Sequence, residues 1–156
     1  MIHLGKILCP TDFSPTSDNA VSYAVEFARK VGAHVRFLNI ITPNNPKQQA
    51  ESTDVPEIHD SVQEDEGIPE NFSKVLMAEK KKGLSADIFF LKGDEAHRII
   101  SEHAASWGAD LIIMGSHGRT GITRLIMGSV AEEVFRSSGV PVLLVKVQAA
   151  EKIVSE

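Results

Sequence analysis

Short apolar runs recur along the chain, separated by longer stretches in which apolar residues return every three or four positions. The runs consist mostly of Val, Ile, Leu and Phe and do not alternate with polar residues. This is typical of strands covered on both faces, as in a parallel sheet. The pattern predicts strands at Lys6–Cys9, Val35–Ile41, Asp87–Leu91, Leu111–Met114 and Val142–Val147.

Helical periodicity fills the gaps between these runs. One gap holds a predicted helix near Asn71–Lys82, and three others carry apolar faces. These faces comprise Ala20, Ala24, Phe27, Ala28 and Val31; Ile99, Ile100, His103, Ala104 and Trp107; and Val130, Val134 and Phe135. The alternation predicts an α/β fold: a doubly wound, Rossmann-like sheet of five parallel strands in the order 3-2-1-4-5, flanked by about four helices.

Glycines and one serine-proline pair mark the expected helix ends. Gly32, Gly83, Gly108 and Gly139 each stand between a helix and the next strand, where a left-handed residue commonly ends the helix. Ser14-Pro15 is typical of a helix start, with serine as the N-cap and proline as the first helical residue.

Residues 43–70 interrupt this alternation. They hold four of the seven prolines together with many Asn, Gln, Asp and Glu residues, which favours a long surface excursion, in part disordered, that leads into the next helix. We therefore expect one domain over residues 1–148, with the excursion at about 43–70 and a frayed tail at 149–156.

Composition narrows the class of protein. The formal net charge of −5 argues against a general nucleic-acid binder, and no apolar run is long enough for a membrane span. The start of the chain has no secretory pattern, and the single cysteine, Cys9, excludes an internal disulfide. We expect a cytoplasmic protein in which Cys9 is a core thiol, with a redox centre as the alternative.

A glycine-rich stretch, GSHGRTGITRLIMGS, begins at Gly115 directly after the fourth predicted strand. Ligands of open α/β sheets bind beyond the carboxyl ends of the strands, where the strand order reverses. Small residues there let the backbone approach a ligand and let its N–H groups point at an anion. The stretch matches neither the P-loop nor the Gly-x-Gly-x-x-Gly fingerprint. A tight turn that binds nothing is the alternative.

The second half of this stretch predicts a helix start at Gly128-Ser129. Ser129 and Glu132 have the spacing of a capping box, with serine as the N-cap and glutamate at the third helical position. A helix N-terminus carries free N–H groups and a partial positive charge. An anion would then lie between this helix start and Gly115 and Gly118, with Arg119 and Arg124 adding positive charge. A short helical turn is expected at 122–127.

Asp12 follows the first predicted strand and is expected to face the glycine stretch. In this topology strands one and four are neighbours, so their carboxyl ends adjoin. The Asp12 carboxylate can accept hydrogen bonds from ribose hydroxyls, or it can hold its own turn by accepting nearby N–H groups. The end of strand two, Asn39-Ile40-Ile41, offers backbone groups and an apolar surface for a base, or is plain core strand.

Together these stretches resemble the universal stress protein family, the UspA-like domains. The family's pattern Gly-x2-Gly-x9-Gly-Ser/Thr is matched by Gly115, Gly118, Gly128 and Ser129. The flanking runs Leu111–Met114 and 138–145 also look like the family, as does the first strand and loop at 7–14. The likeness covers the chain except residues 43–70, where such proteins vary.

The resemblance implies the ATP-binding branch of the family, in which ATP, ADP or AMP is the ligand and Mg²⁺ can accompany the triphosphate. Adenine and ribose would be contacted by Pro10, Thr11, Asp12 and Ile40. Ribose and phosphates would be surrounded by Met114, Gly115, Gly118, Gly128, Ser129 and Val130. It also implies a homodimer that pairs through the last strand, Pro141–Val147, an apolar run that would otherwise be an open edge.

The sequence favours binding over turnover, and no catalytic residue or metal ligand is assigned. No general base stands out; His117 is either a phosphate contact or a solvent-exposed loop residue, and His103 beside Trp107 is expected to be packed. The favoured function is a regulatory ATP-binding protein of the stress response. The alternatives are a slow ATP hydrolase or other nucleotide-using enzyme on the same fold, and an interaction module that binds no nucleotide.

Overall fold

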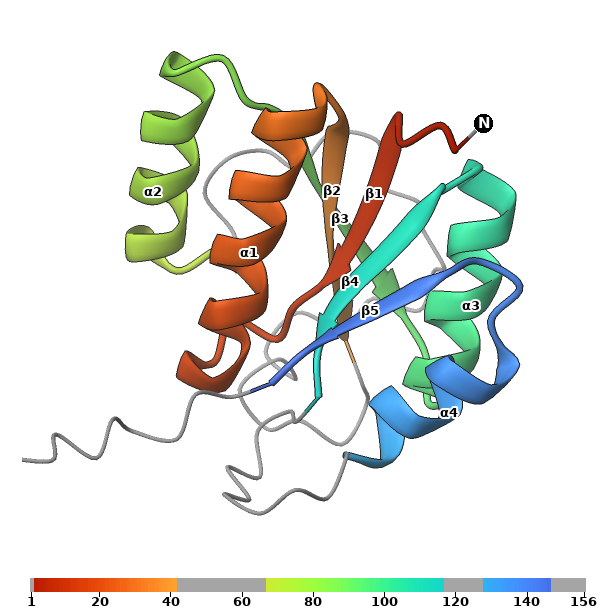
Figure 1. Ribbon diagram of the computed structural model, residues 1–156. Helices are drawn as coiled ribbons and strands as arrows, with labels where there is room; N and C mark the ends of the chain where they lie inside the picture. The colour runs from red at the N-terminus through yellow and green to blue at the C-terminus, as the bar shows by residue number, and fades with distance from the viewer. Residues whose placement is uncertain (1, 42–66, 117–127, 147–156) are drawn as a thin grey trace, which may run out of the picture.

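The computed structural model describes residues 2–41, 67–116 and 128–146. Its centre is a parallel sheet of five strands in the order β3-β2-β1-β4-β5 (Figure 1). The strands are β1 (Lys6–Pro10), β2 (His34–Ile41), β3 (Ser85–Lys92), β4 (Leu111–Gly115) and β5 (Val142–Val145). The helices are α1 (Pro15–Val31), α2 (Glu70–Lys81), α3 (Ala96–Trp107) and α4 (Ser129–Ser137). The predicted fold class and strand order are confirmed.

Strand pairing is least extensive between β1 and β4. β2 pairs with β3 along its full length from His34 to Ile41, and β1 pairs with β2 as far as Pro10. The β1–β4 register, in contrast, runs only from Ile7↔Leu111 to Leu8↔Ile112. This is the point at which the strand order reverses. The last strand is shorter than predicted, because β5 ends at Val145, Lys146 lies beyond it, and Val147 is outside the described residues.

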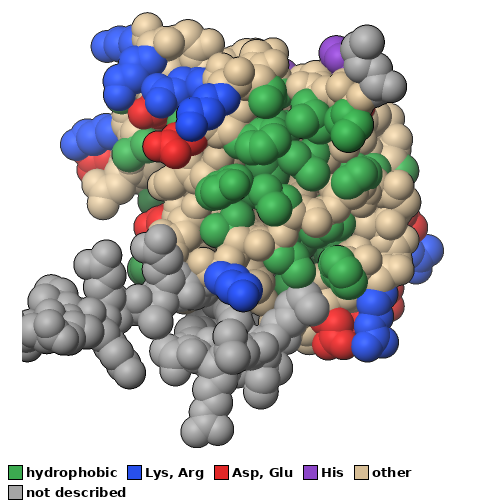
Figure 2. Space-filling model, in the orientation of Figure 1, with side chains coloured by type: hydrophobic (Ala, Val, Ile, Leu, Met, Phe, Trp, Pro, Cys, Tyr) green, Lys and Arg blue, Asp and Glu red, His purple; other side chains and the backbone are tan. Residues whose placement is uncertain are grey.

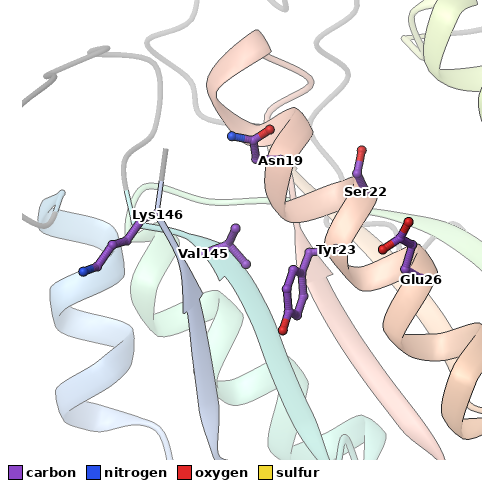
Figure 3. Close-up of a pocket in the computed structure, with 6 residues that line it drawn as sticks. All are labelled: Asn19, Ser22, Tyr23, Glu26, Val145 and Lys146. Carbon is purple, nitrogen blue, oxygen red and sulfur yellow. The ribbon is translucent and has the colours of Figure 1, made fainter. Parts of the chain in front are cut away.

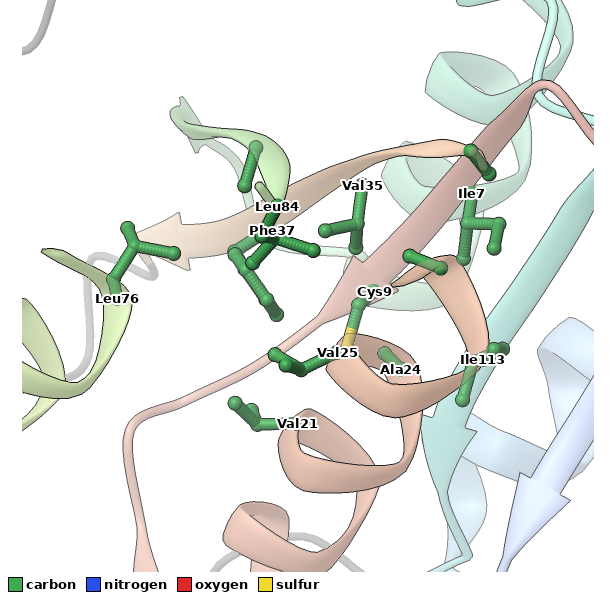
Figure 4. Packing of buried hydrophobic residues seen from close by; sticks show 13 residues of the cluster. Ile7, Cys9, Val21, Ala24, Val25, Val35, Phe37, Leu76, Leu84 and Ile113 are labelled. Atoms are coloured by element: carbon green, nitrogen blue, oxygen red, sulfur yellow. The ribbon is translucent and has the colours of Figure 1, made fainter. Parts of the chain in front are cut away.

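Two helical layers cover the sheet, α1 and α2 on one face and α3 and α4 on the other (Figure 1). Successive residues of a strand point to opposite faces, so each strand contributes to both cores. Figure 4 shows the first core, where side chains of β1 and β2 pack against α1 and Leu76 of α2. Cys9 is fully buried there, and burial raises the pKa of its thiol, as expected of a core residue. Within the described residues, no helix is long and apolar enough to span a bilayer.

Two of the predicted apolar faces need correction. Val31, the last residue of α1, is exposed, whereas Val21 and Val25 are buried instead. In α4 the buried residues are Ala131 and Val134, while Val130 and Phe135 are exposed. At 3.6 residues per turn, Val130 and Phe135 each lie roughly 70° from the centre of the Ala131–Val134 face, which places them at its margins.

The predicted helix ends are confirmed except at Gly139. Ser14 is the N-cap of α1, and Gly32 and Gly108 end α1 and α3 in the left-handed conformation. Gly83, after α2, also has a positive φ. α4 instead ends at Ser138 in an extended conformation. The Ser138 hydroxyl accepts the Val140 N–H at 3.0 Å and donates to the Val140 carbonyl at 3.0 Å, so this side chain makes the turn.

A cluster of charged and aromatic side chains joins β2, β3 and α3. The Arg36 guanidinium lies 4.4 Å from the ring centroids of both Phe89 and Trp107 and pairs with the Asp87 carboxylate at 2.9 Å. Burial opposes ionisation of Asp87, but the hydrogen bonds and charge of Arg36 outweigh it and lower the pKa. His103 stacks on Phe89 with ring centroids 4.9 Å apart, which confirms a packed histidine.

This packing makes fold stability depend on pH through His103. Burial, and secondly the Arg36 charge, lower the His103 pKa below its ordinary value of 6.5. The unfolded chain then binds this proton more readily than the folded chain, so the stabilisation is complete above pH 6.5 and is lost as the pH falls below it. We expect the urea concentration at the unfolding midpoint to decrease when the pH is lowered from 7.5 to 5.5. The decrease should be smaller in His103→Phe, which keeps the aromatic stack but cannot bind the proton. An equal fall of the urea midpoint in the wild type and in His103→Phe would contradict this origin.

Candidate functional site

Backbone hydrogen bonds hold two sets of segments at the carboxyl ends of the strands. The Thr11 N–H donates to the Leu38 carbonyl at 2.9 Å, which extends β1 along β2. The Ser116 N–H donates to the Val145 carbonyl at 3.0 Å, and the Ser116 carbonyl accepts the Gly128 N–H at 2.6 Å. The end of β4, at Gly115, therefore adjoins the start of α4, as the sequence predicted.

The start of α4 differs from the predicted capping box. Gly128, with φ −62° and ψ 154°, is the N-cap and Ser129 is the first helical residue, because the Glu132 N–H donates to the Gly128 carbonyl at 2.9 Å. The Glu132 carboxylate does not return to the N-cap; it accepts from Arg136 at 2.7 Å. Gly128 has no side chain that could cap this helix end. Within the helix the amides of residues 129–131 have no hydrogen-bond partner, and they lie where the helix dipole is positive.

Asp12 holds its own turn, one of the two interpretations left open by the sequence. The Ser14 N–H donates to Asp12 Oδ1 at 2.9 Å, and the Ser14 hydroxyl donates to the same oxygen. Burial and the nearby Asp12 charge raise the pKa of Asp18 in the first turn of α1. The Asp12 charge therefore acts on Asp18, and a cation at this loop would relieve that repulsion.

The donor set fits a divalent ion only if the ligand supplies most of the coordination. In residues 2–41, 67–116 and 128–146, no three His, Cys, Asp or Glu side chains gather as a metal site. Mg²⁺ commonly binds through one or two carboxylates together with substrate phosphates and water. Asp12 is the carboxylate of this loop that can take that part beside a nucleotide.

Ile40 and Met114 lie in the core on the α3 and α4 side. Met114 is 5% exposed, and Ile40 packs partly buried against the same cluster. Their side chains therefore contribute to folding, and a ligand at this edge would reach their backbone groups. Val130 and Ser129 are exposed on the first turn of α4. Gly118 lies outside the described residues, as do His117, Arg119, Gly121, Arg124 and the helical turn predicted at 122–127.

Asn39 is a residue of this edge whose side chain the sequence analysis missed. It is 2% exposed on β2, and its Nδ2 donates to the Thr11 carbonyl at 3.0 Å. Its Oδ1 is buried and has no hydrogen-bond partner in the described part of the chain. The amide therefore ties the end of β2 to the loop after β1. The signal available in the sequence was a polar residue inside the apolar run from Phe37 to Ile41.

Phe13, between Asp12 and Ser14, was also missed. Its φ of 60° makes it the one non-glycine residue with a positive φ in the described part of the chain. For an L residue this conformation costs roughly 1–2 kcal/mol. Its N–H donates to Thr11 Oγ1 at 3.1 Å, and its ring contacts Phe72 of α2 edge to face, with centroids 4.9 Å apart. No pattern in the sequence indicates a left-handed phenylalanine, because glycine is the usual residue for that conformation.

A shallow hollow of about 220 Å³ lies elsewhere, between α1 and the end of β5 (Figure 3). Figure 3 shows Tyr23 and Glu26 of α1 on one side and Val145 and Lys146 on the other. It contains none of the residues predicted to bind a nucleotide. The hollow therefore belongs to the edge of the sheet at β5, and the candidate site is defined by the converging loops.

Comparison with known proteins identifies the family. The model of the "Universal stress protein family" matches residues 3–146. Universal stress protein MJ0577 of Methanocaldococcus jannaschii is 35% identical over 153 residues, covering 90% of this chain and 94% of that protein. A solved structure of MJ0577 superimposes with a TM-score of 0.61 at 26% identity, covering 94% of this chain and 99% of that one.

Two further solved structures share the fold and contain nucleotides. A universal stress protein in complex with cAMP has a TM-score of 0.62 at 22% identity, covering 93% of this chain and 98% of that one. The universal stress protein of Archaeoglobus fulgidus in complex with dAMP has a TM-score of 0.56 at 19% identity, covering 92% and 98%. With the family model spanning nearly the whole chain, the fold and the sequence agree: this chain belongs to the universal stress protein family.

Proposed function

We propose that this chain is an ATP-binding regulatory protein of the cytoplasmic stress response. The observation that carries the proposal is the hydrogen bond from the Gly128 N–H to the Ser116 carbonyl, at 2.6 Å. It holds the start of α4 against the end of β4, at the edge where the strand order reverses. Backbone amides at a helix N-terminus are an anion site, and this edge is where open α/β sheets bind nucleotides.

An adenine nucleotide fits this edge best. The cAMP and dAMP complexes of the two neighbouring structures support an adenine ligand. In this chain the β1–α1 loop, Pro10 to Asp12, and the backbone at Ile40 would hold adenine and ribose. Met114, Gly115, Gly118, Gly128, Ser129 and Val130 would surround ribose and phosphates. Mg²⁺ would bind beside Asp12 and neutralise the charge of the triphosphate. The negative charge of Asp12 and Asp18 favours a cation there.

We further propose that the chain forms a homodimer through its last strand, Pro141–Val147. β5 is at the edge of the sheet, and its residues Val142–Val145 remain partly exposed. Figure 2 shows hydrophobic side chains gathered over the surface where Figure 1 places β5. An apolar edge strand is a ready partner for a second copy, because pairing covers both its side chains and its backbone groups.

Native mass spectrometry of the purified protein tests both proposals in one measurement. We expect a dimer whose bound small molecule has the mass of ATP, ADP or AMP. Added ATP should raise the melting temperature, because a ligand at 100 times its dissociation constant adds about 2.7 kcal/mol to stability. A monomer would contradict the dimer, and an unshifted melting temperature at millimolar ATP would contradict nucleotide binding. Multiple-turnover phosphate release would identify the alternative, a slow ATP hydrolase.

A further inference from the structure

The strained backbone of Phe13 is held by aromatic contacts from outside its own loop. The Phe13 ring lies 4.9 Å from the Phe72 ring and 6.4 Å from the Phe90 ring, measured between centroids. Phe72 in turn packs edge to face on Phe37 in the core, at 5.3 Å. A favourable aromatic pair is comparable in free energy to the cost of one left-handed residue. These contacts therefore suffice to hold the conformation.

The held residue lies within the turn that presents Asp12. Phe13 separates Asp12 from Ser14, and Ser14 donates to the Asp12 carboxylate through its N–H and its hydroxyl. A change of φ at Phe13 redirects the chain between these two groups, so it would alter the orientation of the carboxylate. α2 begins at the same end of the sheet as this loop (Figure 1), and Phe72 is in its first turn.

We propose that Phe13 and Phe72 are positioning residues for the nucleotide. The contact from α2 keeps Phe13 left-handed and thereby keeps the Asp12 carboxylate in the orientation that it has in this turn. This inference rests on the proposed nucleotide-binding function. It assigns to α2, which contributes no residue to the site itself, a role in the affinity of that site.

The test is a double-mutant cycle on ATP affinity, measured by calorimetry. Phe72→Ala should weaken binding about tenfold, because an unsupported phenylalanine leaves the left-handed conformation. Phe13→Gly should bind within about threefold of the wild type, since glycine adopts that conformation without steric cost. In the Phe13→Gly background, Phe72→Ala should then have no further effect on affinity. Equal losses in the two backgrounds would overturn the proposal and leave Phe72 with only a packing role.

Two further variants serve as controls for the double-mutant cycle. Phe72→Leu retains apolar packing if Phe72→Ala does not fold, and it should show the same pattern. Met77→Ala, at a position 58% exposed on the same helix, should leave the affinity unchanged.

Hydrogen exchange of the Ser14 amide, measured without nucleotide, distinguishes a failure of this inference from a failure of the proposed function. It should accelerate in Phe72→Ala alone and not in the double variant. A wild type that binds no ATP would overturn the proposed function and this inference with it. Faster exchange with unchanged affinity would overturn this inference only.

Discussion

Gly128→Asp is expected to abolish ATP binding while leaving the unliganded domain at least as stable as the wild type. Gly128 is the N-cap of α4 in an extended conformation that any residue can adopt. Aspartate is a better N-cap than glycine and interacts favourably with the helix dipole, so stability should rise by ~0.5 kcal/mol. The same carboxylate would occupy the proposed phosphate position. Two like charges 4 Å apart repel by about 4 kcal/mol at an effective dielectric constant of 20, which predicts a loss of affinity of at least about 100-fold.

Opposite changes in binding and stability distinguish this result from simple damage to the fold. Gly128→Asn has the same shape without the charge, so the difference between the two variants isolates electrostatic repulsion from steric exclusion. Gly139→Asp, beyond the other end of α4, adds the same charge where a side chain meets open space. It should retain ATP binding. If Gly128→Asp binds ATP like the wild type, the phosphates do not lie at the start of α4.

Asn39→Asp is expected to destabilise the domain by about 3–5 kcal/mol at pH 7, because it places an unpaired charge in the interior. Asn39 is 2% exposed, and its Nδ2 donates to the Thr11 carbonyl. A protonated aspartic acid can also donate to the Thr11 carbonyl, whereas the ionised form places a carboxylate oxygen against that carbonyl oxygen. Burial therefore raises the pKa of the new carboxyl above its unfolded value of about 3.9. The loss should be small near pH 4 and should grow as the pH rises.

Urea unfolding at pH 4 and pH 7 measures this pH dependence directly. Asn39→Leu is the matched control: it also loses the hydrogen bond to Thr11 but carries no charge. It should cost about 1–3 kcal/mol, by the same amount at both pH values. A pH-independent loss in Asn39→Asp would mean that water or a counter-charge reaches this side chain.

The fold was predictable because apolar runs and helical periodicity agree along the whole described chain. β1 to β4 were placed to within two residues at each end, and α2 was predicted one residue late. The errors arose where a local contact replaced the expected one. The Ser138 hydroxyl made the turn assigned to a left-handed Gly139, and Arg136 took the Glu132 carboxylate that was assigned to the capping box.

The candidate site was predictable in its location and less so in its parts. The expected topology placed Gly115 near the helix start at Gly128, since strand ends and helix starts meet at one edge of a parallel sheet. The roles of Asn39 and Phe13 depend on partners distant in sequence, Thr11 after the neighbouring strand β1 and Phe72 on α2. Such contacts join residues distant in sequence, so no local pattern predicts them.

The limited pairing of β1 with β4 has a mechanical consequence. In its strand pairing the sheet consists of two halves, β3-β2-β1 and β4-β5, joined by two residue pairs. Hydrogen bonds from Gly5 and Lys6 to Asp110, and the packing of α1 on both halves, add to this junction. The proposed adenine and ribose contacts lie mainly on the first half, and the proposed phosphate contacts lie on the second half and on α4. A nucleotide bound across this edge would contact both halves and so connect them. The free energy of binding would then be delivered where strand pairing is least extensive, so occupancy would add to the contacts that hold the two halves together.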